Sequence, residues 1–584
     1  MPNMVRLGGD FIARAPGWRS PCLFLFGLAA CSGEGGGASP FGGSAAGSGG
    51  AGTPGTAGQP STTATGGSSG GSAPMRPPPS SSTALTRVAR LTHEQYQNTA
   101  SALLGISDTP ADEFAPDALN GFAFDSSVDY LVDARLGPQY RAAAEALAEL
   151  AVTQDAVFAR LVSCDPAAAS CAGEFIASFG ERAFRRPLNP AEVGRFSALF
   201  ARGTELVGSG DAFRDGVRLV VEAALQSPQF LYRTELSSAT NANGQVTLDA
   251  WEIASRLSYL AWNSMPDAEL FTLSRSGALS DEVLVESAVR RLLQDGRSTR
   301  KLVSFHEQVW QFARFSKIAP DASTYPLAPV DMATLVSAAS RRFVEEVIAS
   351  GGGLREFLTA PYAFADPGLA PLYGKSTSSG LSKLDFTNGE RQGFLMQVGF
   401  LASNAYAIKT DPIHRGLFVL RDLLCRHVAE PPPGASTTPP PATPVPPKTT
   451  REEVSALTEQ TGCKVCHAQI NPPGYAFEGF DAIGRVRMEE GGVPVDTSGT
   501  ITLDGANVSF ADAHALVQAL ATSAEARACY ARKWLLFAHG RNLDANDEAQ
   551  VSSLATESIP VKDLVTRIAT SSAMLRRLPN EVAP

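Results

Sequence analysis

Cys463-Lys464-Val465-Cys466-His467 is the segment around which this 584-residue chain is organised, and Ala-Gln-Ile-Asn-Pro-Pro-Gly-Tyr follows it at 468–475. The spacing Cys-x-x-Cys-His is typical of covalent haem attachment. Two cysteines three positions apart lie on one side of a helical turn, so both sulfurs can bond the vinyl groups of one haem. The histidine that follows can offer its imidazole to the iron. The sequence therefore predicts one covalent haem c per chain, held by Cys463, Cys466 and His467.

Two other interpretations of the motif remain open. With 8 Cys and 7 His in the chain, the pattern arises by chance in about one sequence in a thousand of this composition. Cys463 and Cys466 can instead form a disulfide, or half of a zinc site. A zinc site needs further cysteines or histidines nearby, and the sequence has none between residues 468 and 513. We therefore favour haem over both alternatives.

The second axial ligand of the iron is less well defined by the sequence. Between His467 and His514, Met488 is the only methionine, histidine or cysteine, so it is the first candidate for a metal ligand. A lone methionine is more often a packing residue. His414, His514 and His539 can also approach through folding, and a five-coordinate iron would favour ligand or peroxide chemistry.

The residues behind the motif predict how the site is supported. Asn471-Pro472-Pro473 is expected to make a stiff turn, in which a carbonyl accepts the proton on the other imidazole nitrogen of His467. Tyr475, Phe477 and Phe480 can cover the edges of the porphyrin, serve as ordinary core aromatics, or do both.

The length and net charge of the chain limit the classes of protein to which it can belong. A chain of 584 residues is too long for one core and predicts three or four domains. The net charge is −10 and the isoelectric point about 5.4, so no basic surface for nucleic acid is expected. We find no nucleophile elbow, phosphate-binding loop or dinucleotide fingerprint.

The first 31 residues resemble a lipoprotein signal peptide. Arginines at positions 6, 14 and 19 precede a short apolar run at 21–28, which is too short to span a bilayer as a mature helix. The run ends in Leu28-Ala29-Ala30-Cys31-Ser32, which resembles a bacterial lipobox with Cys31 as the lipidated residue. The alternative is an ordinary signal peptide with a stray cysteine. Ser32 after the cysteine resembles an outer-membrane sorting signal.

Residues 32–82 are Gly, Ser, Ala, Thr and Pro with almost no large apolar side chain. Such a segment cannot bury enough surface to offset its chain entropy. It predicts a disordered tether between a lipid anchor and a folded body.

The remainder predicts a mainly α fold: a multi-domain helical body with a small cytochrome c-like haem segment and a short β hairpin within 484–510. Helical periodicity and start signals predict helices beginning at Thr92, at 134–152, after Asn189, and at 212–226, 249–262, 282–294, 298–313, 331–350, 451–462, 524–538 and 560–574. The expected divisions are N-terminal helical domains at 83–240, a central helical domain at 241–385, the haem-binding domain with a proline-rich strap at 386–510, and a C-terminal helical domain at 511–584.

The remaining cysteines predict two disulfides. Cys164 and Cys171 are close together in a chain expected to be exported, which favours a local bridge over two free thiols. Once this pair and the signal-peptide and motif cysteines are set aside, Cys425 and Cys529 are each other's only partners. Their bridge would connect the segment before the motif with a helix after it.

Several stretches together resemble the exported, planctomycete-type multi-domain cytochrome c-like proteins, also found in myxobacteria and built of successive domains of unknown function. The matching stretches are Leu91–Thr99, Arg182–Leu188, Leu225–Arg233, Arg256–Asp267, His414–Gly416, Cys463–His467 with Gly474–Arg485, and Ala538–Arg541. The resemblance covers nearly the whole chain after the tether and implies a haem-c motif on an α-rich, exported scaffold. It supplies no substrate, and Met488 does not fall at a position typical of that family.

These observations lead us to expect a membrane-tethered c-type cytochrome that transfers electrons in the cell envelope. Its lipid anchor would lie in the outer membrane, facing the periplasm or the cell surface, and its redox partner protein is not identified by the sequence. One alternative is an enzyme, a haem oxidoreductase or peroxidase acting on an external organic substrate. Another is a structural or binding lipoprotein in which the motif cysteines form a disulfide.

Overall fold

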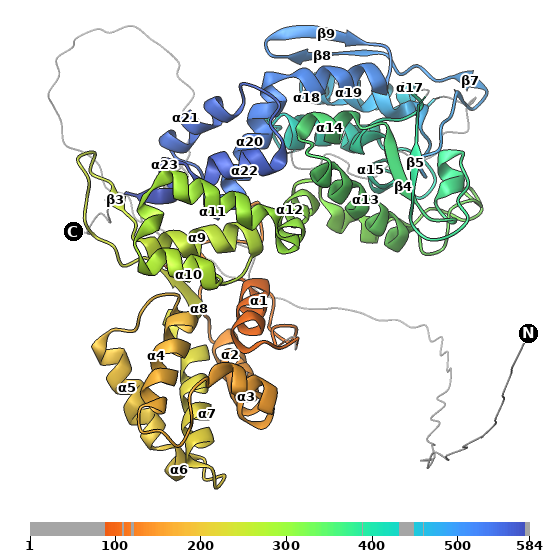
Figure 1. The fold of residues 1–584 in the computed structure, drawn as a ribbon. Coiled ribbons are helices and arrows are strands. Elements are labelled where there is room, and N and C mark those ends of the chain that lie inside the picture. Colours follow the sequence, from red (N-terminus) through yellow and green to blue (C-terminus); the bar gives the residue numbers. More distant parts are fainter. Residues whose placement is uncertain are drawn as a thin grey trace, which may run out of the picture. The chain divides into compact units, whose positions relative to one another are not determined.

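The computed structural model describes residues 88–107, 110–117, 122–387, 389–430, 449–459 and 461–578. The predicted signal peptide, Cys31, the tether at 32–82 and the proline-rich segment at 431–447 lie outside the described residues. Helices dominate the described part, and the strands are short (Figure 1). This confirms the predicted mainly α fold.

The first part of the body is a group of helices between two paired strands. Its elements are β1 (Val88–Arg90), α1 (His93–Leu104), α2 (Leu136–Thr153), α3 (Asp155–Leu161), α4 (Cys171–Phe184), α5 (Pro190–Ala201), α6 (Gly203–Leu206), α7 (Ala212–Leu225), α8 (Pro228–Leu231) and β2 (Tyr232–Thr234). Strand β1 runs antiparallel to β2, with Val88 opposite Thr234. The pairing brings the beginning of this group next to its end.

The central part is also helical. It contains β3 (Val246–Thr247), α9 (Ala250–Trp262), α10 (Ala268–Arg275), α11 (Glu282–Gln294), α12 (Gly296–Val309), α13 (Met332–Ala349), α14 (Leu354–Thr359), β4 (Tyr362–Ala365) and β5 (Ser382–Asp385). Short 3₁₀ helices lie at Ala278–Ser280, Phe312–Lys317, Ala370–Tyr373 and Phe394–Met396.

The last part carries the Cys-x-x-Cys-His motif. Its elements are α15 (Val398–Ser403), α16 (Pro412–Phe418), the π-helical turn η5 (Val419–Leu423), α17 (Thr450–Thr458), α18 (Thr461–Tyr475), a 3₁₀ turn at Ala476–Gly479, β6 (Glu489–Glu490), β7 (Val493–Pro494), β8 (Gly499–Leu503), β9 (Ala506–Phe510), α19 (Ala513–Thr522), α20 (Ala524–His539), α21 (Ala545–Leu554), α22 (Val561–Ala569), α23 (Ser572–Leu575) and β10 (Arg576–Arg577). Strands β8 and β9 form the predicted hairpin. Strand β10 pairs with β3, far away in the sequence.

Two predicted helix starts have the expected capping geometry. The Thr92 side chain accepts a hydrogen bond from the backbone of Gln95, whose side chain accepts one from the backbone of Thr92. Asn189 and Glu192 form the same reciprocal pair at the start of α5. Both pairs satisfy backbone N–H groups that the first helical turn leaves without partners.

The buried apolar side chains form two cores. One comes mainly from α1–α8, and the other from α9 to the C-terminal helices. Helix α9 contributes to both, since Ile253 and Leu257 lie in the second core and Tyr259 in the first. The second core is rich in aromatic rings.

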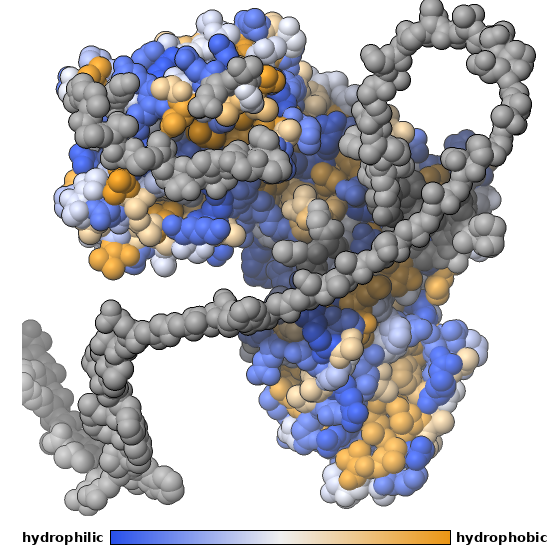
Figure 2. Space-filling model, turned by 180° about the vertical axis from the view of Figure 1, so that it is seen from behind, coloured by the Kyte–Doolittle hydropathy of each residue, from blue (hydrophilic) through white to orange (hydrophobic). Residues whose placement is uncertain are grey.

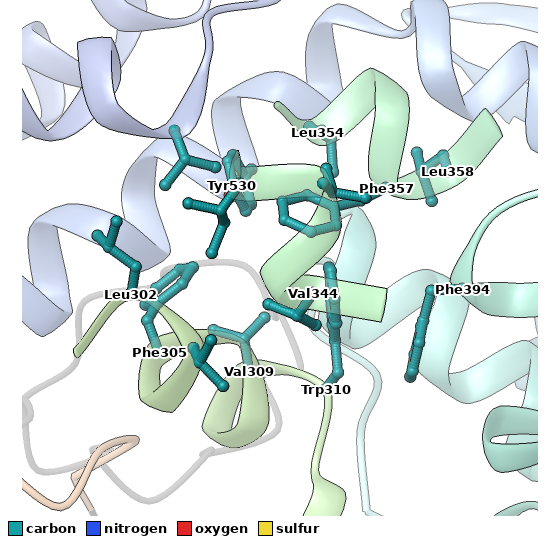
Figure 3. Close-up of a cluster of buried hydrophobic side chains, with 14 of the residues drawn as sticks. Leu302, Phe305, Val309, Trp310, Val344, Leu354, Phe357, Leu358, Phe394 and Tyr530 are labelled. Carbon is teal, nitrogen blue, oxygen red and sulfur yellow. The ribbon is translucent and has the colours of Figure 1, made fainter. Parts of the chain in front are cut away.

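Figure 3 shows the centre of the second core, where side chains of α12, α13, α14 and α20 converge. The ring of Phe305 stacks on Trp534 at 3.7 Å between centroids, and Trp310 stacks on Phe394 at 4.6 Å. Such pairs add to the gain from apolar burial. The Phe305–Trp534 pair holds α20, which follows the motif in sequence, against α12, which precedes it.

Candidate functional site

The three motif residues lie near the start of α18. Cys463 and His467 are four residues apart, and Ile470 and Gly474 continue the same helical face. Both cysteines are free thiols of intermediate exposure, and Cys466 packs against the second core. One face of a single helix therefore presents the two sulfurs and the imidazole together.

The predicted stiff turn at Asn471-Pro472-Pro473 is wrong, because α18 continues through both prolines to Tyr475. A proline inside a helix removes the hydrogen bond to the carbonyl four residues earlier. Here those carbonyls belong to Ala468 and Gln469, which are exposed. Water can satisfy them, so the helix is not forced to end.

His467 is oriented by a buried amide. Its Nδ1 lies 2.9 Å from Oδ1 of Asn471, which is 6 % exposed. The Asn471 Nδ2 donates to Oγ1 of Thr458 at 2.8 Å, and Thr458 donates in turn to the carbonyl of Val454 at 2.7 Å. Because the amide nitrogen is engaged, the amide oxygen faces the imidazole and accepts the Nδ1 proton. The lone pair then lies on Nε2, the arrangement that metal-binding histidines usually have.

Helix α18 crosses α16 in very close contact. A Cβ added to Gly474 would lie 1.8 Å from the carbonyl oxygen of Pro412, and one added to Gly416 would lie 1.9 Å from the carbonyl oxygen of Ile470. Real Cβ atoms do not approach backbone so closely, so only glycine fits at either position. The crossing fixes the helical face that continues from the motif.

A buried charge network holds the segment after the motif. Arg415 is fully buried and donates to the carbonyls of Phe477 and Leu401 at 2.9 and 3.0 Å. Glu478, also fully buried, accepts from Arg487 at 2.8 Å and lies 3.3 Å from Arg415. Burial raises the pKa of Glu478, and the two arginines oppose that shift.

Sequence reasoning did not identify this network. Arg415 lies in the stretch His414–Gly416, which matches the family. Arg415 and Glu478 are 63 positions apart, and no sequence pattern predicts that two such distant residues pair.

The aromatic residues after the motif are core residues in this structure. Tyr475, Phe477 and Phe480 are 5 %, 0 % and 5 % exposed, and the hydroxyl of Tyr475 lies 2.9 Å from that of Ser455.

Large apolar side chains nevertheless reach the surface in this part of the chain: Leu457, Val465, Val486, Met488 and Val493. Figure 2 shows apolar surface on the body that carries these elements. Val465 lies on α18 itself, so part of this apolar surface borders the motif.

The candidate second ligands lie on different elements. Met488 is 78 % exposed, just before β6. His414, on α16, has its Nδ1 2.5 Å from Oδ2 of Asp411, and His514 lies on α19. His539, at the end of α20, is buried, and burial lowers its pKa to about 3.

Both predicted disulfides are present. Cys164 is bonded to Cys171 at the start of α4, and Cys425 to Cys529 in α20. The second bridge ties the end of η5 to α20 across the segment that contains the motif. Within the described ranges, no group of three or more His, Cys, Asp or Glu side chains is arranged to hold a metal ion. Among the described helices, none combines the length and the apolar composition that a bilayer-spanning segment needs.

Five family models match the chain in succession, and each is described as a protein of unknown function: DUF1587 at 89–153, DUF1595 at 171–235, DUF1592 at 248–374, DUF1588 at 391–490 and DUF1585 at 507–574. The DUF1588 model bears the short name PSCyt3, and its match contains α16, α18 and the motif. No curated protein and no solved structure shows significant similarity to the chain. The chain is thus a multi-domain protein composed of these five domains of unknown function.

Proposed function

We propose that this protein is a c-type cytochrome that carries one haem covalently on α18 and transfers electrons in the cell envelope. Cys463 and Cys466 would form the two thioether bonds, and His467 would bind the iron through Nε2. The proposal rests on the chemical form and the arrangement of these three side chains. Two unbridged thiols and an imidazole anchored at Nδ1 lie on one helical face.

The bound group would supply one-electron redox chemistry at iron. The chain's own contribution is to orient His467 through Asn471 and to fix α18 against α16. The short name of the matching DUF1588 model, PSCyt3, also supports a cytochrome-like role for residues 391–490.

The lipid anchor is part of the same proposal. Lipidation at Cys31 would hold the protein in the outer membrane, facing the periplasm or the cell surface. Export of the chain is supported by the two disulfides, and it fits covalent haem attachment. A Cys31→Ala variant should lose radiolabelled fatty acid and move from the membrane to the soluble fraction.

The deciding experiment is haem staining after denaturing electrophoresis of protein produced in cells that mature c-type cytochromes. We expect the wild-type band to stain and the Cys463→Ser/Cys466→Ser variant to lose the stain. Cys164→Ser/Cys171→Ser, which alters another closely spaced cysteine pair, should keep it. A colourless wild-type protein with Cys463 and Cys466 joined in a disulfide would contradict haem and support a structural lipoprotein.

An enzymatic role is the second candidate, because the helical body is much larger than electron transfer alone requires. The absorption spectrum separates the two roles. A low-spin, six-coordinate iron that does not react with peroxide would support electron transfer, whereas a peroxide-reactive, five-coordinate iron would support a haem oxidoreductase or peroxidase.

Met488 remains the proposed second ligand, and its substitution tests the assignment. If Met488 binds the iron, Met488→Leu should keep the haem stain but change the spin state of the oxidised protein. An unchanged spectrum would exclude Met488, and His414→Ala would then be the next variant, since the Nδ1 of His414 is also anchored by a side-chain acceptor.

A further inference from the structure

A second site lies away from the motif, in a cavity of about 580 Å³. Its walls come from segments that are far apart in sequence: β1 and β2, the start of α9, the end of α20, α21, and the residues from α22 to β10. The volume is in the range of sites that bind small organic molecules. None of Cys463, Cys466 and His467 contributes to it.

The lining carries an excess of positive charge. It contains six arginines and four carboxylates: Arg233, Arg256, Arg541, Arg567, Arg576 and Arg577, with Glu235, Glu252, Asp544 and Asp547. The carboxylates are all occupied by the protein itself. Glu235 pairs with Arg256 at 2.6 Å and Asp547 with Arg541 at 2.6 Å, while Glu252 and Asp544 accept hydrogen bonds from backbone N–H groups.

Arg233 differs from the other five arginines. Each of those is paired with a carboxylate, for example Arg567 with Glu557 at 2.9 Å. The Arg233 guanidinium forms no hydrogen bond or ion pair with any residue in the described ranges. It lies over the ring of Tyr259, 5.3 Å from the ring centroid, and the carboxylate of Glu235 acts on it only through longer-range electrostatics. Burial lowers its pKa. Removing a cation from water is costly when no carboxylate is hydrogen-bonded to it, and a bound anion would offset that cost.

Two further polar atoms at the cavity have no hydrogen-bond partner among the described residues, although one of them, Nε2 of His539, lies 3.7 Å from Oδ1 of Asp547. Nε2 of His539 and Oγ of Ser571 are buried without a hydrogen bond, as is Nε of Arg233. Buried polar atoms are nearly always hydrogen-bonded, so three such atoms around one cavity indicate an occupant or ordered water. Apolar side chains, including Val128, Leu554 and Met574, also line the cavity.

We propose that this cavity binds a small organic anion. Its carboxylate or phosphate group would accept hydrogen bonds from the guanidinium of Arg233, whose planar fork matches either oxyanion. Its apolar part would lie against the apolar side chains of the wall. The proposal does not depend on haem.

Isothermal titration calorimetry of the full chain tests whether the cavity binds an organic anion. The four probes are benzoate, phenyl phosphate, inorganic phosphate and the neutral benzamide. We expect benzoate or phenyl phosphate to bind, and the tighter of the two identifies the preferred oxyanion. Failure of both to bind would overturn the proposal. If benzamide binds as tightly as the preferred anion, the negative charge has no role and the proposal is overturned. If inorganic phosphate binds as tightly, the inference that the ligand is organic is overturned.

The Arg233→Gln variant should weaken binding of the preferred probe by about tenfold or more, because a charge-assisted hydrogen bond is lost. Arg341→Gln is the matched control, since Arg341 is 55 % exposed on α13 and does not line the cavity. It should bind as the wild type does. Wild-type affinity in a folded Arg233→Gln variant would overturn the assignment.

A measurement on the wild type covers the case in which Arg233→Gln does not fold. Arginine-selective labelling with phenylglyoxal, mapped by mass spectrometry, should be slowed at Arg233 by the preferred probe and unchanged at Arg341. Labelling of Arg233 at the same rate with and without the probe would contradict the site.

Discussion

Asn471 decides which nitrogen of His467 is available. Its amide is buried between Thr458 and the imidazole. The Thr458 hydroxyl donates its hydrogen to the carbonyl of Val454, so its oxygen accepts the hydrogen bond from the Asn471 amide nitrogen. The direction of each hydrogen bond therefore follows from the one before. A single side chain sets both the tautomer and the orientation of the ring.

Asn471→Ala should alter the site and also destabilise the fold. We expect a loss of about 1–3 kcal/mol in the free energy of unfolding, because Thr458 and the imidazole each lose a partner. The haem stain should survive, but the midpoint potential should shift. Urea unfolding and redox titration measure the two effects.

Thr458→Val is the control for this prediction. It removes a partner of Asn471 without removing the acceptor for the imidazole, so stability should fall while the potential changes less. Equal shifts in the midpoint potential for both variants would contradict the orienting role of Asn471.

His306 and His539 make the stability of the fold depend on pH. Burial lowers the pKa of each to about 3, whereas the pKa in the unfolded chain is near 6.5. Below pH 6.5 the unfolded chain therefore binds protons that the folded chain does not. The free energy of unfolding should fall as the pH is lowered from 6.5 to 5, by up to about 1.4 kcal/mol per pH unit for each histidine.

Urea unfolding at pH 7, 6 and 5 tests this expectation. His306→Gln should be less stable at every pH, because Leu302 and Tyr530 lose their partner, but its stability should depend less steeply on pH. A slope that the substitution leaves unchanged would contradict the protonation argument.

At the scale of elements, the crossing of α16 and α18 is the contact most sensitive to side-chain size. Gly474→Ala places a methyl group against the backbone of Pro412, which cannot move without displacing α16. We expect a loss of several kcal/mol, or failure to fold, since overpacking against backbone is poorly relieved. Urea unfolding checks the size of the effect.

Gly462→Ala is a matched control on the same helix. No atom outside its own helix lies within 4 Å of a Cβ added there, and alanine favours helix by about 0.5–1 kcal/mol over glycine. This variant should be neutral or slightly stabilised. Similar destabilisation of both variants would show that the crossing is not the cause.

At the scale of the whole molecule, the two disulfides should contribute unequally. They span 7 and 104 residues, and the chain-entropy model gives about 2 and about 5 kcal/mol for such loops. Cys425→Ser/Cys529→Ser should therefore lower the urea midpoint more than Cys164→Ser/Cys171→Ser. A larger effect from the short loop would contradict the entropic argument.

Much of this architecture follows from local patterns. The capping pairs Thr92–Gln95 and Asn189–Glu192 predicted two helix starts correctly, because a cap is formed within four consecutive residues. The partner of Cys164 could be predicted equally well from the sequence, since it lies seven positions away. The partner of Cys425 was found by elimination, which needed only the cysteine count.

Other features were not accessible to such patterns. The prolines after the motif predicted a turn, yet α18 continues, because the exposure of Ala468 and Gln469 depends on how the helix packs. The pairing of Arg415 with Glu478 joins α16 to the segment after α18. No sequence signal marks either outcome.

By itself, the sequence determined the helical class, the helix caps, the cysteine pairing and the candidate haem motif, because each depends on a few neighbouring residues or on a count. Only the tertiary structure decided how Asn471 faces His467, how two glycines let α16 and α18 touch, and how Arg233 comes to line a cavity with no hydrogen bond from its guanidinium to a described residue. These depend on distances between segments far apart in the chain, which are set by packing rather than by local preference.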